Sequence, residues 1–114
     1  MRAIFIVVTV AFQLLAGPAY ATKSAGQDAA ALGAKHVAEG DADGAVAAYE
    51  KAVTLDPDNA GLHLQLAGAY GLAAQQAGMV FRIGWARKAR VAYEKAVELD
   101  PTNLAAREGL MSFY

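Results

Sequence analysis

Hydrophobic and polar positions divide the chain into one apolar run and a series of amphipathic helical segments. Residues 3–16 are mostly apolar, whereas from residue 24 onward apolar side chains recur at the three- and four-residue spacing of helices. The first helical segment is expected to stop at Gly40. The second is expected to stop at Asp56-Pro57, because the residue before a proline is forced out of helical geometry. The pattern predicts an all-α protein.

Polar residues at segment starts predict where each helix begins. Ser24, with Gln27 three residues later, has the spacing of a capping box and predicts the start of the first helix. Asp41, Asn59 and Asn103 stand where the following helices need N-cap residues, because short polar side chains can accept hydrogen bonds from the free amides of a first turn. The chain is therefore expected to consist of several helices joined by turns.

The N-terminal apolar run has the layout of a secretory signal peptide. Arg2 is the only charge before Lys23, and the small-x-small site Ala19-Tyr20-Ala21 follows the run. A membrane span needs about 20 mostly apolar residues, and Gly17-Pro18 interrupts this one. We therefore expect residues 1–21 to be a cleavable signal peptide and the mature protein to reside in an exported compartment, the bacterial periplasm. A retained anchor is the alternative.

The rest of the chain contains an internal repeat. Residues 48–59 and 92–103 are identical at ten of twelve positions. The chain resembles tetratricopeptide repeat proteins, whose units are helix-turn-helix hairpins of 34 residues. The resemblance implies antiparallel helix-turn-helix repeats stacked as a short α-solenoid over 22–114: repeat 1 over about 26–59, repeat 2 over about 60–103, and the first helix of an incomplete third repeat over 104–114. Residues that match the family pattern are Leu32, Gly33, Ala45, Tyr49, Ala52, Pro57, Leu66, Tyr70, Ala89, Tyr93, Ala96 and Pro101.

The second repeat is expected to be elongated. Leu32 and Leu66 are 34 positions apart, whereas Pro57 and Pro101 are 44 apart, so ten residues are inserted. The inserted sequence is apolar and helix-forming, which predicts two longer helices with their turn at Gly78. Shared between two helices at 1.5 Å per residue, ten residues lengthen the hairpin by roughly 7 Å.

The second helix of this hairpin carries the clearest candidates for partner binding. Its packing stripe is predicted to contain Met79, Ile83, Ala86, Ala89, Tyr93 and Val97. Phe81 and Trp85 fall outside this stripe, close to the cations Arg82 and Lys88. Aromatic and arginine side chains dominate binding energy at interfaces, so these residues can form a hot spot; alternatively, the two aromatics pack against Leu72 or the next repeat. By resemblance, the groove lies on the first helix of each unit, at positions that include Gln27, Leu64 and Leu72.

Charge is distributed unevenly between the repeats. The chain has a formal net charge of −1. Its first repeat has a net charge of −5 and its second repeat a net charge of +2. Four cations and no acid lie between 79 and 93. The lack of an overall basic excess argues against nucleic acid as a partner.

The sequence offers little for catalysis or metal binding. There is no cysteine, and the serines are only Ser24 and Ser112. His36 and His63 occupy positions where the family has core aromatic residues, and a metal site normally needs three or more ligands. We expect no catalytic residues, no metal and no cofactor, and we interpret the protein as a non-enzyme.

These features favour a non-catalytic adaptor that binds a segment of a partner protein through its repeat groove. Membrane-surface association through the basic and aromatic segment at the end of this hairpin, residues 79–90, is an alternative. The apolar segment 104–114 suggests either that the chain is the N-terminal part of a larger repeat protein or that this helix docks onto another copy. The identity of the partner is not encoded in any motif.

Overall fold

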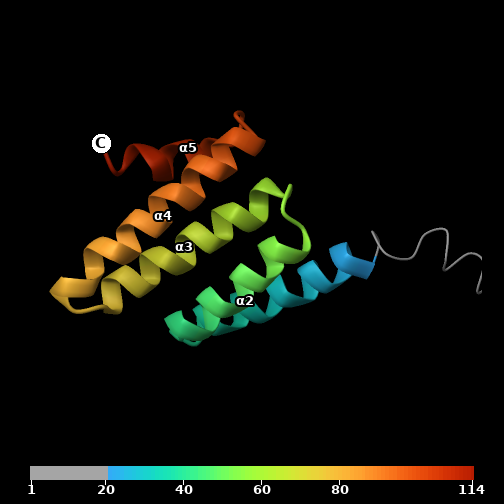
Figure 1. Cartoon of the computed structure of the whole chain (residues 1–114), viewed down its shortest axis with the longest axis horizontal. Coiled ribbons are helices and arrows are strands. Elements are labelled where there is room, and N and C mark those ends of the chain that lie inside the picture. Colours follow the sequence, from blue (N-terminus) through green and yellow to red (C-terminus); the bar gives the residue numbers. More distant parts are fainter. Residues whose placement is uncertain (1–20) are drawn as a thin grey trace, which may run out of the picture.

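The computed structural model describes residues 21–114, and all the regular structure in this part of the chain is helical (Figure 1). The first helix spans 21–38. It is followed by α2 (Ala42–Leu55), α3 (Ala60–Gln76), α4 (Met79–Leu99) and α5 (Leu104–Met111). The predicted signal segment lies outside the described residues, except for Ala21. None of the described helices is both long enough and apolar enough to cross a bilayer.

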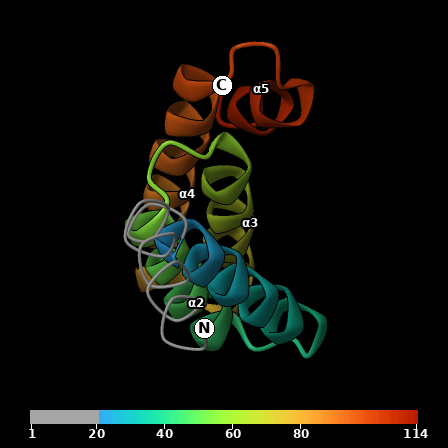
Figure 2. The same ribbon diagram turned by 90° about the vertical axis from the view of Figure 1, so that its right-hand side faces the viewer.

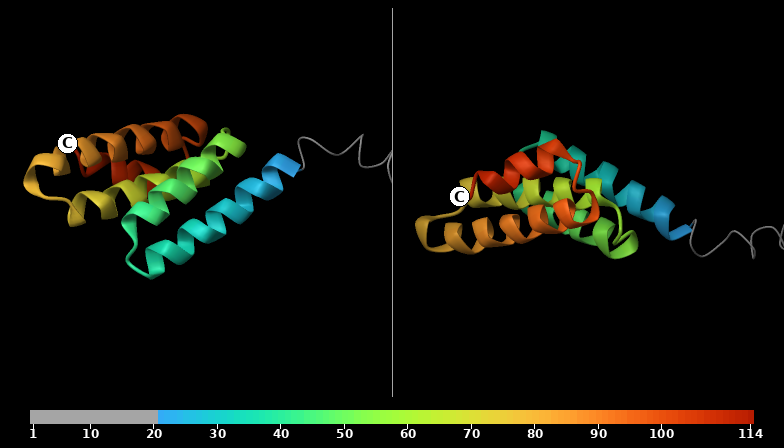
Figure 3. Two further views of the ribbon diagram at one scale, coloured as in Figure 1. Left: turned by 60° about the horizontal axis from the view of Figure 1, so that its bottom comes forward. Right: turned by 90° about the horizontal axis from the view of Figure 1, so that it is seen from above.

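Consecutive helices run antiparallel and pack in chain order. The pairs α2 and α3, α3 and α4, and α4 and α5 are in contact. Figure 2 places the first helix, α3 and α5 on one side of the stack and α2 and α4 on the other, and Figure 3 shows the same order from two further directions. This alternation of first and second helices in two layers is that of an α-helical repeat solenoid.

The polar residues at the turns act as predicted. Asp41 is the N-cap of α2, and its Oδ1 accepts a hydrogen bond of 2.9 Å from the backbone amide of Gly44. Asn59 and Asn103 cap α3 and α5 by accepting hydrogen bonds from backbone amides three residues later. Gly40 ends the first helix with a φ of +74°, a left-handed conformation that glycine adopts without strain. These four predictions are confirmed.

One local prediction is wrong and another is confirmed. The first helix already includes residue 21, so Ser24 and Gln27 lie inside it and form no capping box. No proline or glycine between Ala21 and Ser24 interrupts the helix, so the first helix continues through Ser24 and does not begin there. The predicted turn at Gly78 is confirmed: Gly78 lies between α3 and α4 and is the N-cap of α4, with a φ of −65°.

The core is built mainly from alanine. Thirteen of the seventeen buried apolar residues are alanines, and no polar or charged residue of 21–114 is buried. Ala45, Ala52 and Ala96 have no exposed surface. Small side chains let helix axes approach closely, so the contact area comes from many short contacts instead of a few large side chains. The high alanine content of the sequence therefore reflects helix packing.

The repeat-signature residues differ in burial between the two repeats. Tyr49 is 3% exposed and lies over Gly33, where an added Cβ would come within 2.8 Å of its ring. Tyr93 is only half-buried and packs against Phe113 at a ring-centroid distance of 6.1 Å. Leu66 is buried between helices, whereas its counterpart Leu32 is 49% exposed because no earlier helix of 21–114 covers it.

The second hairpin is longer than the first. Measured from the repeat motif, α3 continues four residues further past Leu66 than the first helix continues past Leu32. Helix α4 begins seven residues earlier before Tyr93 than α2 begins before Tyr49. The turn between the two helices is one residue shorter. The end of this hairpin consequently projects from the stack (Figure 1).

The predicted packing stripe of the second helix is wrong at its N-terminal end. Met79 is 84% exposed and Ile83 is 68% exposed. The side chain that packs against the core there is Trp85, on the face that continues through Ala89 and Ala92 toward α3. Periodicity shows which residues share a face, but the projecting end has no neighbouring helix to cover the face that contains Met79 and Ile83.

Candidate partner-binding surfaces

An open groove of about 720 Å³ lies between α3 and α4. Its α3 side is formed by His63, Leu66 and Tyr70, which are spaced so that they share one helix face. Its α4 side repeats this helical spacing with Gly84, Arg87, Lys88, Val91, Ala92 and Lys95. Apolar side chains form the floor and three cations form the rim. No acidic residue within 21–114 lines the groove.

Tyr70 joins the groove to the first repeat. Its hydroxyl donates a hydrogen bond of 3.2 Å to Glu50 Oε1 on α2. Burial, the negative charge of Glu50 and this hydrogen bond together raise the pKa of Tyr70 to about 12. The side chain is therefore neutral at physiological pH. Because Tyr70 contacts Glu50 on α2 and lines the groove together with residues of α4, the groove lies on the side of α3 that faces these two helices.

Lys88 is held at the rim by aromatic rings. Its Nζ lies 4.9 Å from the ring centroid of Trp85 and 5.9 Å from that of Tyr70, both within the range of cation–π attraction. The two rings lie 6.0 Å apart with an interplanar angle of 34°. The ammonium group of Lys88 is thus held beside the rings of Trp85 and Tyr70.

The other rim cations have different surroundings. Lys95 Nζ lies 3.6 Å from Glu98 Oε1, but both side chains are exposed, and such pairs contribute little to stability. Arg87 forms no salt bridge with any residue of 21–114. The rim therefore keeps a positive field toward the groove.

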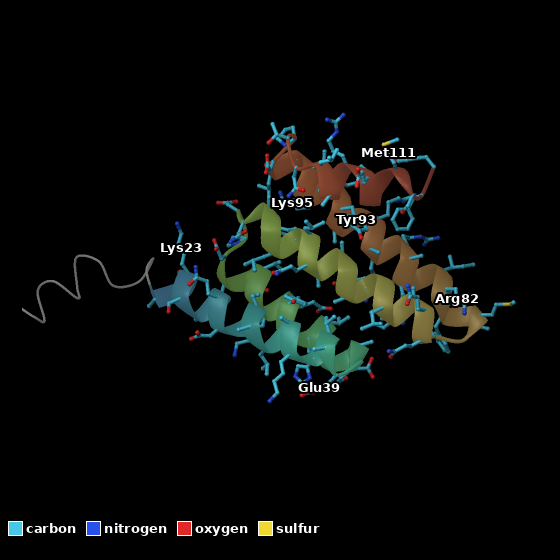
Figure 4. The ribbon with its side chains drawn as sticks, turned by 180° about the vertical axis from the view of Figure 1, so that it is seen from behind. Lys23, Glu39, Arg82, Tyr93, Lys95 and Met111 are labelled. Carbon is cyan, nitrogen blue, oxygen red and sulfur yellow. The ribbon has the colours of Figure 1, made fainter. Side chains whose placement is uncertain are left out.

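A second surface is the hairpin tip, defined here as residues 79–83. Met79, Val80, Phe81 and Ile83 are between 68% and 85% exposed. Arg82 is exposed among them and lies at the projecting end of the hairpin (Figure 4). Four large apolar side chains are thus concentrated in little more than one helical turn, in contact with solvent.

The seven predicted partner-binding residues do not form one site. Trp85 and Lys88 lie together with Tyr70 beside the groove, whereas Phe81 and Arg82 belong to the hairpin tip. The remaining three lie elsewhere: Leu72 is half-buried against the core, Leu64 is half-buried on α3, and Gln27 is exposed on the first helix.

The sequence indicates only a structural role for the groove residues on α3. Leu66 and Tyr70 fit the repeat signature, and His63 stood at an aromatic position of the family pattern. The available signal was the spacing of Lys88 and Lys95, which are two helical turns apart on the face that also carries Val91. That spacing indicates a basic and apolar stripe on α4. It does not indicate that an open groove lies between this stripe and α3.

The two histidines have separate surroundings. His36 Nδ1 lies 3.0 Å from Asp41 Oδ2 in the first turn. His63 Nε2 lies 2.8 Å from the carbonyl oxygen of Pro57, at the other end of α2. Within residues 21–114 there is no group of three or more side chains suited to hold a metal ion.

The all-α architecture and the open grooves define a helical repeat solenoid with surfaces suited to binding. Comparison with family models agrees: residues 33–72 match a model described as TPR repeat, and residues 81–103 match one described as tetratricopeptide repeat. The two matches together cover more than half of the chain and support its assignment to the tetratricopeptide repeat family. No curated protein and no solved structure matches the chain.

Proposed function

We propose that the protein is a non-catalytic adaptor that holds a segment of a partner protein in the groove between α3 and α4. Tetratricopeptide repeats generally mediate protein–protein interaction, and neither family match indicates a catalytic family. The observation that carries the proposal is the groove itself, with an apolar floor and a rim of Arg87, Lys88 and Lys95. Its volume lies within the range of sites that bury several side chains of a ligand.

The groove favours a particular chemistry of partner. Leu66, Val91 and Ala92 offer apolar contact, so the centre of the bound segment is apolar. The positive rim favours Asp or Glu on either side of that centre, because complementary charge speeds association and selects the partner. The groove thus differs from the first-helix face implied by the family resemblance, and it adds acidic flanks to the apolar segment expected from the sequence.

The location in an exported compartment remains part of this proposal and rests on the N-terminal sequence. Arg2, the apolar run and the site at Ala19-Tyr20-Ala21 support it. Mass spectrometry of the protein made with its whole N-terminal segment in an export-competent host should find Thr22 as the first residue. An intact N-terminus would favour the retained anchor.

Selection of binders from a random peptide library tests the groove. Wild-type protein should enrich peptides with apolar centres and acidic flanks. The double charge reversal Lys88→Glu/Lys95→Glu should weaken the selected peptides by about tenfold and shift the enrichment to basic flanks. Arg82→Glu/Arg107→Glu is the matched control, because it reverses two exposed charges outside the groove and should leave the selection unchanged.

The contrary outcomes are clear. If the double variant enriches the same peptides as wild type, the rim does not select the partner. If the control variant shifts the selection as strongly as the rim variant, overall charge and not the groove determines binding.

A further inference from the structure

The hairpin tip is apolar over most of its circumference, and Arg82 is its one charged residue. Met79, Val80, Phe81 and Ile83 are all largely exposed. At 100° per residue, positions 79, 80 and 81 point in three different directions around the helix axis. A helix that docks sideways onto a protein needs one apolar stripe, whereas here apolar side chains spread over about 200° of the helix circumference and Arg82 occupies the remaining side. This surface is therefore suited to entering an apolar medium end-on.

Positive charge follows directly behind the apolar end. Arg82 lies within the tip, and Arg87, Lys88 and Arg90 come one to two turns later, before the first acid of α4 at Glu94. Arg90 pairs with Glu94 at 3.7 Å, but Arg82 and Arg87 form no salt bridge within 21–114. The charge is therefore available to an external anion.

The spacing of these two features matches a lipid interface. Residues 79–83 occupy about 6 Å along the helix axis, and Arg87 and Lys88 stand about 12–14 Å behind Met79. Segments that bind at a bilayer surface bury their apolar part about 5–10 Å deep, and nearby Lys and Arg side chains interact with anionic headgroups. The apolar residues 79–83 can therefore reach the boundary of the acyl chains while Arg87 and Lys88 lie at the level of the lipid phosphates.

A second copy of the chain is a less suitable partner for the tip. One concave apolar surface on another copy is the groove, whose rim carries Arg87, Lys88 and Lys95. Docking the tip there would bring Arg82 close to these cations, and like charges in an interface oppose association. A smaller concave surface on the first hairpin is lined by one acid and one cation, Asp28 and Lys51, so it offers little net charge to attract Arg82. The charge of the tip instead complements an anionic surface.

We propose that the hairpin tip is a membrane-docking site that inserts end-on into an anionic lipid surface, in addition to partner binding by the groove. Gly84, the first groove residue on α4, directly follows Ile83. Docking through the tip therefore holds the groove beside the lipid surface. The N-terminal end of the described chain, marked by Lys23, lies at the other end of the molecule from Arg82 (Figure 4).

Site-specific fluorescence on the full chain tests this proposal. The protein contains no cysteine, so Val80→Cys and Met111→Cys each attach one environment-sensitive dye to a single position. These side chains are 85% and 71% exposed, which makes Met111 on α5 a matched control away from the tip. Because both are exposed, neither substitution disturbs the core.

The expected result is a blue shift of the Val80 dye with vesicles of phosphatidylcholine and phosphatidylglycerol. The shift should be absent with phosphatidylcholine alone and reversed by salt, and the Met111 dye should not respond. Introducing Arg82→Gln or Arg87→Gln into the Val80-labelled chain should weaken vesicle binding by about fivefold for each charge removed.

Three results would overturn the proposal. The first is no shift of the Val80 dye on anionic vesicles. The second is an equal shift of the Met111 dye, which indicates binding without insertion of the tip. The third is a shift of the Val80 dye with rising protein concentration and no vesicles, which assigns the tip to self-association. None of these results bears on peptide selection by the groove, so the two proposals fail independently.

Discussion

The two hairpins share one sequence motif but present different surfaces. In the first hairpin Tyr49 is buried against Gly33, and the repeat has a net negative charge. In the second hairpin the equivalent Tyr93 is half-buried, the helices project further, and a groove with a basic rim opens beside them. The motif therefore determines how the helices of a unit meet. Residues outside the motif determine whether the unit closes on itself or offers a surface to a partner.

The largest expected effect separates the two motif tyrosines. Tyr49→Ala should lower the free energy of unfolding by about 3–5 kcal/mol, because a nearly fully buried ring leaves a cavity. Tyr93→Ala should cost about 1–2 kcal/mol, because part of its ring already contacts water. Urea denaturation followed by circular dichroism measures both. Equal costs would show that the motif position, and not its burial, determines stability.

Replacing one glycine in each hairpin by alanine should change the free energy of unfolding by smaller amounts and in opposite directions. Gly33→Ala places a Cβ about 2.8 Å from the Tyr49 ring and should destabilise the fold by about 1–3 kcal/mol. Gly84→Ala meets no atom within 4 Å and should stabilise α4 by about 0.5–1 kcal/mol, because alanine loses less backbone entropy in a helix. Thermal unfolding of both variants checks the signs. A destabilising Gly84→Ala would mean that the groove wall is closer than the structure places it.

The last contrast appears at alkaline pH and concerns the contact between the two repeats. Because folding raises the pKa of Tyr70 from 10.0 to about 12, its contribution to stability is fully present below about pH 10 and is lost as the pH rises through about 12. Tyr70→Phe keeps the ring against Trp85 and should remove this component of the alkaline loss. Unfolding free energies measured against pH, with tyrosinate absorbance as a second observable, test it. An unchanged alkaline profile in the variant would assign the loss to other groups.

Helix ends could be predicted where the signal is local. Asp41, Asn59 and Asn103 cap helices through amides three residues away, so the sequence around each contains the whole interaction. Ser24 failed as a helix start because a capping residue can also lie inside a helix when nothing before it stops the helix. Local signals therefore locate most helix boundaries but do not exclude a longer helix.

The binding surfaces could be predicted only in part, because they depend on neighbours distant in sequence. Phe81 and Trp85 are four residues apart on one helix, yet Trp85 contacts Tyr70 of α3 while Phe81 is 70% exposed. Met79 and Ile83 continue the apolar period of α4, but no helix covers that face at the projecting end. The charge of the groove rim was visible in the sequence, whereas the space beside Leu66 was not.

The unequal lengths of the two hairpins have a geometric consequence. The four extra residues of α3 amount to about one helical turn, and the seven extra residues of α4 amount to about two. Trp85 stays in line with Ala89 because residues four apart lie on the same side of a helix, and residues added in nearly whole turns leave the last added side chains near that same side. Such a hairpin can change length in steps of a turn while its base keeps the same contacts. Its reach from the stack can then be adjusted independently of the fold that supports it.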